Sequence, residues 1–347
     1  MAIRKRYVGG VRLQERHYEV FVEGVALSKV TKKREKNIVY TVRELADSLL
    51  ARLKLSYNDI DAYVVSNSMG GLFGIPEFMR YVLPTAFGSH KVVYEVSCDE
   101  CAGLGAVIRA YKLIKSGIFS RILVVSGMQI NLKNIDELKD IIFSDIVSDT
   151  ENIVKEFLSK EKMDKKEIDQ VLYQYYENAM KNNYLDKKEL KKKSFDPSEF
   201  PELKNSAGVC ILSNKYSARV KDVKIGYADE VTVNAQNIYS SISSAVSFFS
   251  ENIDKQNIDA VEISSINPVL DIIFSKNLGL EKDVKINPSG GSYFSNSPPA
   301  SPFISFAYLY EYIKSGRRGG LVFSIAIRSL DHFGVVQLIN EKKSKKE

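Results

Sequence analysis

LIKSGIFSRILVVS at residues 113–126 decides the fold, because the chain repeats it as YIKSGRRGGLVFSI at residues 312–325. A second stretch repeats along with it: NDIDAYVVSNS (58–68) returns as QNIDAVEISSI (256–266). The offset is 199 residues for the first pair (113 to 312) and 198 for the second (58 to 256). Either match alone would carry little weight. Two matches at nearly one spacing indicate two copies of one structural unit.

The repeated unit alternates strands and helices. Apolar, β-branched runs predict strands, and the run 101–117 has apolar residues at helical spacing and ends on Gly117, a typical helix stop. Strand, helix and strand in this order form a βαβ crossover, so we expect a largely parallel sheet covered by helices. A capping box at Thr41 and Glu44 predicts the start of another helix. The predicted strands are 7–13, 17–27, 60–68, 91–97, 121–127, 208–215 and 221–231, and the further predicted helices are 41–53 and 238–253.

The composition changes between the two copies. Residues 131–200 are rich in Lys, Glu, Asp and Tyr, and predict amphipathic helices inserted at the surface. We therefore predict an N-terminal half made of residues 1–130 and 201–215, a helical insertion at 131–200, and a C-terminal half at 216–347.

Composition and charge exclude several classes of protein. The chain has 347 residues, 44% of them hydrophobic and 27% charged, which suits a large apolar core and excludes general disorder. A net charge of +6 is mild, and the Lys/Arg clusters lack interleaved aromatic residues, so nucleic acid is not expected as a partner. Neither a signal peptide nor an apolar run of roughly 18 residues is present, so we expect a cytoplasmic protein without a membrane anchor.

Catalytic and ligand-binding residues are expected where strands end and helices begin, because free helix N–H groups and the helix dipole face that point. In the first copy this place holds Cys98 and Cys101, and in the second copy it holds residues 286–302. A thiolate at a helix N-terminus is stabilised, which makes it a nucleophile. The Cys-X-X-Cys spacing also admits a redox site, although the surrounding fold differs from that of thioredoxin. No second cysteine pair or paired histidines accompany it, so no metal site is expected.

These features together resemble the thiolase superfamily, in particular the archaeal and sterol-carrier-protein-type thiolases. The resemblance covers nearly the whole chain and rests on the duplication, on ELADSLLARLKLSYNDIDAYVV (44–65), on the insertion, on NSAGVCILSN (205–214) and on NPSGG (287–291). It implies a duplicated α/β/α/β/α fold of five layers with a helical insertion. It also implies that Asn287, Ser289, Gly290 and Gly291 line a substrate site, since these thiolases carry the same five residues shortly before their catalytic histidine.

The nucleophile's position is where this sequence departs from the family. Aligning without gaps on the small residues of the helix puts Glu100 in place of the catalytic cysteine. A one-residue gap would restore Cys101, and a two-residue insertion would restore Cys98. The ungapped register is the simplest, and we prefer it.

The family's proton carriers are also replaced. Ser297 stands where the resemblance places the catalytic histidine, and a hydroxyl cannot shuttle protons near neutral pH as an imidazole does. Asn267 is a displaced counterpart of the family's active-site asparagine. The second cysteine has no equivalent, because no cysteine follows Cys210, but His332 lies in that loop and could substitute as a base.

The resemblance implies a protein that handles acyl-CoA or acetyl-CoA, a coenzyme A thioester being the one ligand expected. We predict a catalytically impaired member, acting as a binding or structural partner in a homodimer or with another thiolase-family or HMG-CoA-synthase-like enzyme. The alternatives are an active acyltransferase or Claisen-condensing enzyme that uses Cys101 or Cys98 with His332, and a Cys-X-X-Cys redox protein. A thiol within reach of His332 in the cavity would argue against the impaired enzyme.

Overall fold

The computed structural model describes most of the chain and groups its strands into one ten-stranded sheet and a separate two-stranded one. Among the residues described, no helix combines the length and the apolar character needed to cross a bilayer. The described residues are 7–8, 11–12, 18–32, 36–66, 78–129, 151–161, 164–197, 201–234, 237–265, 267–281, 283–297, 300–326 and 331–344.

The large sheet contains two copies of one strand order, as the repeat predicts. Its order is β10-β9-β11-β12-β8-β3-β7-β6-β4-β5, so β3 to β7 and β8 to β12 mirror each other about the β3–β8 junction. Only two residue pairs join the copies there, Val20 with Ile225 and Phe21 with Lys224. The strands are β3 (Val20–Leu27), β4 (Ala62–Ser66), β5 (Val92–Val96), β6 (Arg121–Met128), β7 (Ser206–Asn214), β8 (Val223–Thr232), β9 (Ala260–Ser264), β10 (Lys285–Ile286), β11 (Gly319–Ile325) and β12 (His332–Asn340).

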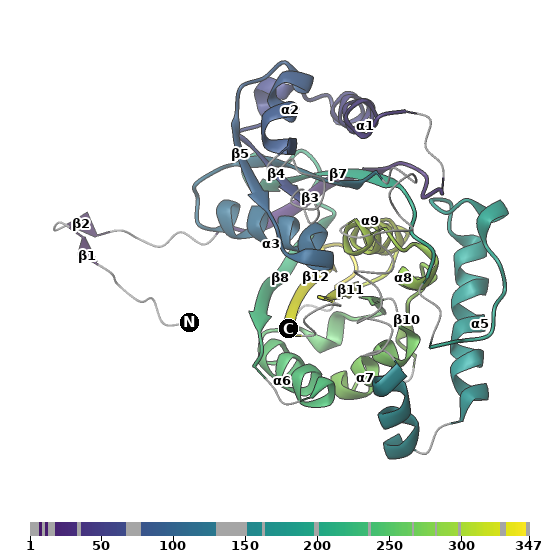
Figure 1. The fold of residues 1–347 in the computed structure, drawn as a ribbon. Helices are drawn as coiled ribbons and strands as arrows, with labels where there is room; N and C mark the ends of the chain where they lie inside the picture. The colour runs from purple at the N-terminus through teal and green to yellow at the C-terminus, as the bar shows by residue number, and fades with distance from the viewer. Residues whose placement is uncertain are drawn as a thin grey trace.

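Helices complete five layers, which Figure 1 shows from α1 and α2 at the top to α6 and α7 at the bottom. In the middle, α3 and α9 contact each other between the two strand sets, and their apolar side chains form one core cluster with both sets. The outer helices cover the far faces with two further clusters. The helices are α1 (Ile38–Arg52), α2 (Phe78–Phe87), α3 (Ala102–Lys115), α5 (Lys165–Lys181), α6 (Ile238–Ser250), α7 (Pro268–Leu278), α8 (Gly291–Phe294) and α9 (Ser301–Lys314), and the 3-10 turns are η1 (Tyr57–Asp59), η2 (Asp99–Cys101), η4 (Lys187–Glu189) and η5 (Lys255–Asn257).

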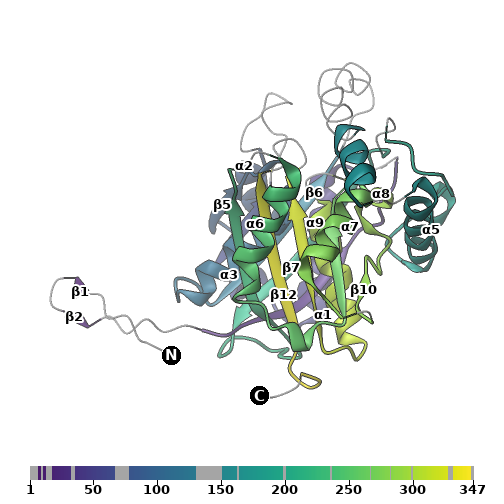
Figure 2. The same ribbon diagram turned by 90° about the horizontal axis from the view of Figure 1, so that it is seen from below.

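The described part of the insertion packs on the second copy. Residues 151–161 are helical and α5 follows them; both contribute to the core cluster that contains α6 and α7. Figure 2, which turns the molecule by 90°, shows α5 at the side of α7 and α8. Residues 130–150 lie outside the described part of the chain. The domain boundaries proposed at 130, 200 and 215 stay predictions.

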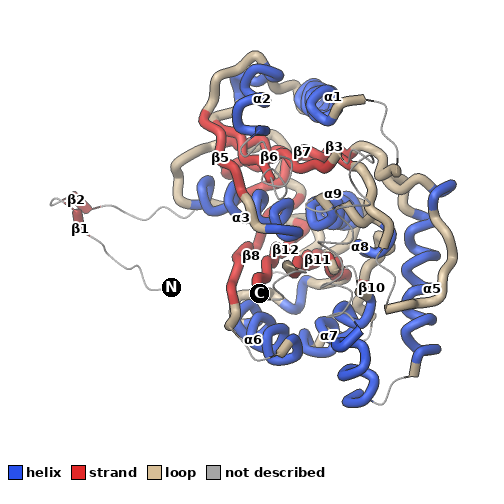
Figure 3. The backbone as a smooth tube through the Cα atoms, viewed as in Figure 1, coloured by secondary structure: helices blue, strands red, loops and turns tan. Residues whose placement is uncertain are grey.

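Three details differ from the sequence-based expectations. The sheet is mixed, because only the pairs around β4 and β9 are parallel, and β3, β7, β8 and β12 run antiparallel to their neighbours. Helix α1 begins at Ile38, because the Asn37 side chain accepts the Val39 N–H at 2.9 Å, so Thr41 lies within the helix. The expected strand 7–13 is two short antiparallel strands, β1 (Tyr7–Val8) and β2 (Val11–Arg12), visible apart from the main body in Figure 3.

Candidate active site

Cys98 lies at the start of the helical run that ends in α3. It follows β5, and its carbonyl oxygen accepts the Cys101 N–H at 2.9 Å, which closes the η2 turn. Gly105 lets α3 approach β5, because a Cβ there would lie 3.1 Å from Val96 Cγ1. The Cys98 side chain is half-buried. It therefore sits at the positive end of a helix dipole with partial access to solvent.

His332 comes to this place from the other copy. It is the first residue of β12 and pairs with Thr232 of β8, whose Oγ1 lies 3.1 Å from His332 Nδ1. Its Nε2 lies 3.8 Å from Glu230 Oε2. Lys112 Nζ lies 2.7 Å from Asp229 and 3.6 Å from Glu230 and so holds the acidic pair. The imidazole is thus flanked by a hydroxyl and a carboxylate that fix its orientation.

The two side chains form a charged pair. Hydrogen bonds from the Cys101 thiol and from His332, together with the His332 charge, lower the pKa of Cys98 to about 6 despite its partial burial. The hydrogen bond with Cys98 is also the main cause that raises the pKa of His332, and the nearby Glu230 raises it further. The two shifts together favour a thiolate on Cys98 beside a protonated His332, the arrangement that activates a cysteine nucleophile.

Cys101 lies behind Cys98 and remains a thiol. Burial raises its pKa well above the ordinary value, and the Cys98 sulfur and the Glu100 carboxylate raise it further, although the Ser324 hydroxyl acts in the opposite direction. Its Sγ lies 3.7 Å from the His332 carbonyl oxygen, to which it donates. The Cys98 sulfur is the second acceptor beside this thiol, and donation to it favours the Cys98 thiolate. Glu100 is buried in the same turn.

The site joins the two copies of the repeat. The η2 turn lies against β11, β12 and α9 of the second copy. Cys98 and Cys101 belong to the first copy, whereas His332, Glu230 and Thr232 belong to the second. The sequence therefore pointed to Cys98, Cys101 and His332, and the structure brings these three together.

The NPSGG residues belong to a different network. Ser289 donates from its N–H (2.7 Å) and Oγ (2.6 Å) to Glu262, and Asn287 Nδ2 donates to Asp271 at 2.7 Å. Asn182 Nδ2 of the insertion donates to the Ser289 carbonyl at 3.0 Å. Burial raises the pKa of both carboxyls, Glu262 and Asp271, to about 8. These contacts bind β9, α7 and the segment after α5 together.

Gly290 and Gly291 complete this junction. Both have positive φ, and a Cβ on Gly290 would lie 2.6 Å from Ala179 Cβ of α5, so the backbones touch there. Among the described contacts, the hydrogen bonds of the NPSGG segment lead to the insertion, to β9 and α7 and, through Tyr308, to α9; none of them leads to Cys98. A pair of glycines before a helix indicates close approach of the backbone, either to another element or to a ligand.

Asn267 and Ser297 lie elsewhere on the second copy. Asn267 is the N-cap of α7, where its Oδ1 accepts the Val269 N–H at 2.9 Å. Its Nδ2 is buried with no hydrogen-bond partner among the described residues. Ser297 is fully buried, and its Oγ lies 2.7 Å from Ser206 Oγ.

Sequence reasoning missed Glu230 and Thr232. Glu230 lies in the strand that the sequence predicted at 221–231, and Thr232 lies one residue beyond it; the adjacent acids Asp229 and Glu230 were a visible signal. Their link to His332 depends on the antiparallel β8–β12 pairing, which the sequence does not indicate. In the described part of the chain no group of three or more His, Cys, Asp or Glu side chains could hold a metal ion.

The fold and the position of the site define a protein with the thiolase-like duplicated α/β architecture. Among solved structures, one chain of an assembly described as an Ltp2-ChsH2(DUF35) aldolase has this fold: the TM-score is 0.73, with 10% sequence identity over 93% of this chain and 98% of that one. In all, 723 chains of solved structures match, so the likeness does not select a function. A scan against family models and a search of the curated proteins found no match.

Proposed function

We propose that the protein is an acyl-CoA-dependent acyltransferase in which Cys98 is the nucleophile and His332 the general acid and base. The observation that carries this proposal is that the turn with Cys98 and Cys101, at the start of the α3 helical run, lies against His332 of the other copy. A hydrogen bond between the Cys98 and His332 side chains lowers the pKa of Cys98 and raises that of His332. Resemblance to thiolases supplies the substrate class, a coenzyme A thioester. The proposal replaces our preference for Glu100 at the nucleophile's position.

In the first step the Cys98 sulfur attacks the thioester carbonyl carbon of the acyl-CoA. The positive end of the helical run lies beside the carbonyl oxygen as its negative charge develops. The tetrahedral intermediate then expels the coenzyme A sulfur, which takes the proton of His332. The products are an acyl-Cys98 thioester, coenzyme A and a neutral imidazole.

In the second step neutral His332 takes a proton from the acceptor. For a Claisen condensation the proton comes from the α-carbon of a second acyl-CoA, whose carbanion attacks the acyl-Cys98 carbonyl and releases the Cys98 thiolate. Thr232 holds the imidazole through Nδ1 at 3.1 Å, and the Glu230 carboxylate, 3.8 Å from Nε2, stabilises its charged form by charge rather than by a hydrogen bond. One histidine thus serves both half-reactions.

We propose Asn267 as a binding residue. Its Nδ2 is a buried donor without a protein partner among the described residues, and such a donor suits a ligand carbonyl. We propose that Asn287, Ser289, Gly290 and Gly291 act on substrate indirectly, because they hold α5 and α8 in place.

The second candidate function is that of a catalytically impaired protein that acts as the binding or structural partner of another enzyme. Ser297 favours it, because a buried hydroxyl bonded to Ser206 stands where the resemblance expects the catalytic histidine. The Ltp2-ChsH2(DUF35) description names two components, so an assembly with another protein is part of this candidate. We propose the cytoplasm for either function, since Cys98, Cys101 and Cys210 are all free thiols and a nucleophilic thiol needs a reducing compartment.

We propose that two copies of the chain form a dimer through the β5 edge of the large sheet. β5 is the end strand of the large sheet, and its first residue, Val92, is 54% exposed. An unpaired strand edge with exposed apolar side chains suits pairing with a second copy. Light scattering of the wild type and of Val92→Lys tests this: the variant should be monomeric where the wild type is dimeric, and an unchanged dimer would exclude the β5 edge.

The activity is tested by intact mass after incubation with acetyl-CoA and with longer acyl-CoA thioesters. We expect an acyl adduct on the peptide of residues 92–109, which lies between Lys91 and Arg109 and contains Cys98 and Cys101. The adduct should persist in Cys101→Ser and be lost in Cys98→Ser, a matched pair in one turn. An unmodified wild type with every thioester would support the impaired partner instead.

A further inference from the structure

Cys98 and Cys101 form a pair whose two members differ in character. Cys98 is a half-buried thiolate, whereas Cys101 is 1% exposed and remains protonated. Their side chains are hydrogen-bonded to each other, and one 3-10 turn, closed by the 2.9 Å bond from Cys101 N–H to the Cys98 carbonyl, holds both. A thiolate open to small molecules with a protected thiol behind it has the arrangement of an attacking and a resolving cysteine.

We propose that Cys98 and Cys101 form a site of reversible oxidation by peroxide, with Cys98 as the attacking and Cys101 as the resolving cysteine. Acyl transfer does not require this property, and the acyltransferase proposal gives Cys101 no chemical step. The site nevertheless shares the Cys98 sulfur, so oxidation and acylation exclude each other.

The chemistry balances with hydrogen peroxide as the oxidant. The Cys98 thiolate attacks one peroxide oxygen, the O–O bond breaks, and the departing hydroxide takes the His332 proton and leaves as water. The Cys98 sulfenic acid is then attacked by the Cys101 sulfur. The S–O bond breaks, hydroxide combines with the Cys101 proton to leave as water, and a Cys98–Cys101 disulfide remains.

Two features favour formation of the Cys98–Cys101 disulfide over further oxidation of Cys98. The resolving thiol lies in the same 3-10 turn as Cys98, so the second step needs no encounter between distant groups. Burial keeps Cys101 away from bulky reagents, so Cys98 is the first point of attack. Cys210, the third cysteine, is fully buried in β7, and burial raises the pKa of its thiol far above the ordinary value, so it does not compete.

The test treats the reduced full-length protein with equimolar hydrogen peroxide and measures its intact mass. We expect loss of two hydrogen atoms, a crosslink within peptide 92–109, and return of the reduced mass with dithiothreitol. Cys101→Ser should stop at a sulfenic acid that dimedone traps, Cys98→Ser should not react, and Cys210→Ser should behave as the wild type.

Three results would overturn the proposal: an unreacted wild type, oxidation to sulfinic acid without a disulfide, or a crosslink between chains. The acylation experiment is run separately on reduced protein, and it reports on Cys98 alone. If Cys98 is acylated but the disulfide does not form, the acyltransferase proposal stands and the oxidation proposal fails. If the disulfide forms but no acyl adduct is found, only the oxidation proposal stands.

Discussion

At the scale of single residues, the question is which side chain between β5 and α3 occupies the position of the nucleophile. The sequence identified Cys98, Cys101 and His332, but the ungapped register favoured Glu100 as the counterpart of the family's nucleophile. The η2 turn explains the difficulty, because a 3-10 turn before α3 can hold extra residues without disturbing either the strand or the helix. Sequence spacing cannot locate such an insertion, and the proposal of Cys98 over Glu100 rests on its contact with His332.

Glu230→Gln tests the electrostatics around His332. The Glu230 carboxylate raises the pKa of His332, so its neutralisation should move the titration of His332 to lower pH. The chain has only three histidines, and proton NMR of the ring signals can follow each one.

Asp229→Asn is the matched control for that experiment. Asp229 adjoins Glu230 in β8, and its carboxylate pairs with Lys112 at 2.7 Å, so the His332 titration should move less. Equal shifts in both variants would mean that Glu230 has no specific role beside the imidazole.

At the scale of elements, the strands and helices to which the sequence assigned ranges lie, apart from 7–13, within about three residues of the observed ones, whereas others, α2 and α7 among them, were not predicted. The sequence misjudged the strand directions, because apolar runs do not distinguish a central parallel strand from the antiparallel β7 and β12. It also placed α1 three residues late, because Asn37 caps the helix before the apolar pattern begins. The contact between α5 and the NPSGG segment involves residues more than a hundred positions apart, which periodicity cannot show.

Gly290→Ala tests this contact between α5 and the second copy. Gly290 has φ +100°, and an added Cβ would lie 2.6 Å from Ala179 Cβ and 2.8 Å from the Ala179 backbone. We expect a loss of about 3 kcal/mol in the free energy of unfolding, since overpacking adds to the cost of a left-handed alanine.

Gly279→Ala is the control, measured by the same urea titration. Gly279 has φ +58° but nothing within 4 Å of an added Cβ, so only about 1 kcal/mol should be lost. Equal losses in the two variants would show that the close approach of α5 contributes nothing.

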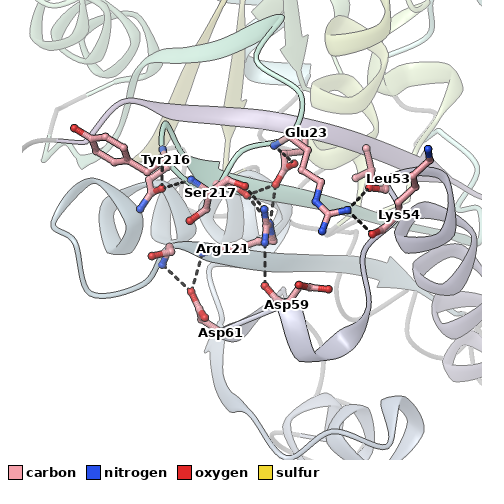
Figure 4. A network of polar contacts seen from close by, with 12 residues as sticks. Glu23, Leu53, Lys54, Asp59, Asp61, Arg121, Tyr216 and Ser217 are labelled. Carbon is pink, nitrogen blue, oxygen red and sulfur yellow. Dashed lines mark hydrogen bonds and ion pairs between the residues drawn. The ribbon is translucent and has the colours of Figure 1, made fainter.

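A buried ion pair ties β3 to β6, as Figure 4 shows. Arg121 Nε donates to Glu23 Oε1 at 2.8 Å, and Glu23 Oε2 accepts the Arg219 N–H at 2.7 Å. Arg121 also donates to Ser213 Oγ at 3.1 Å, and Glu23 lies at the bulge of β3. Since both charges are buried, each depends on the other for compensation.

Glu23→Gln should therefore destabilise the fold by about 3–5 kcal/mol, because it leaves the Arg121 charge buried and unpaired. Glu44→Gln, which breaks the exposed Lys36–Glu44 pair, should cost less than ~1 kcal/mol. Thermal unfolding of both variants checks this. A Glu23→Gln variant as stable as Glu44→Gln would show that the buried pair is dispensable.

At the scale of the whole molecule, the duplication was the most informative feature of the sequence. It predicted two copies of one α/β unit, and the structure confirms them as two mirrored strand sets, with α3 and α9 between them. The site lies where the sets meet, so neither copy contains it alone. The sequence could predict the copies but not the β8–β12 register that delivers Glu230 and Thr232 to His332.

The contribution of Glu262 and Asp271 to the stability of the protein should fall as pH rises from about 4 to about 8. Burial raises the pKa of Glu262 and of Asp271 to about 8, so in this window the folded protein holds protons that the unfolded chain has released. The slope per group is at most ~1.4 kcal/mol per pH unit. Below pH 4 the contribution is fully present, and above 8 it has been lost.

Asp271→Asn should flatten this pH dependence. The stability of the variant relative to that of the wild type should be higher at pH 8 than at pH 5. Urea midpoints measured at pH 5, 6, 7 and 8 for both proteins provide the check. Parallel curves for the two proteins would mean that Asp271 has an ordinary pKa in the folded state.

The central claim is that His332 keeps Cys98 as a thiolate. The most direct measurement is the rate of Cys98 alkylation by iodoacetamide between pH 4.5 and 9.5, followed on peptide 92–109 in Cys101→Ser and in Cys101→Ser with His332→Asn. Because Cys101 itself lowers the pKa of Cys98, both midpoints lie above that of the intact pair, but the protein with His332 should titrate at lower pH than the one without it. Coincident midpoints near the ordinary cysteine value of about 8.5 would contradict the account.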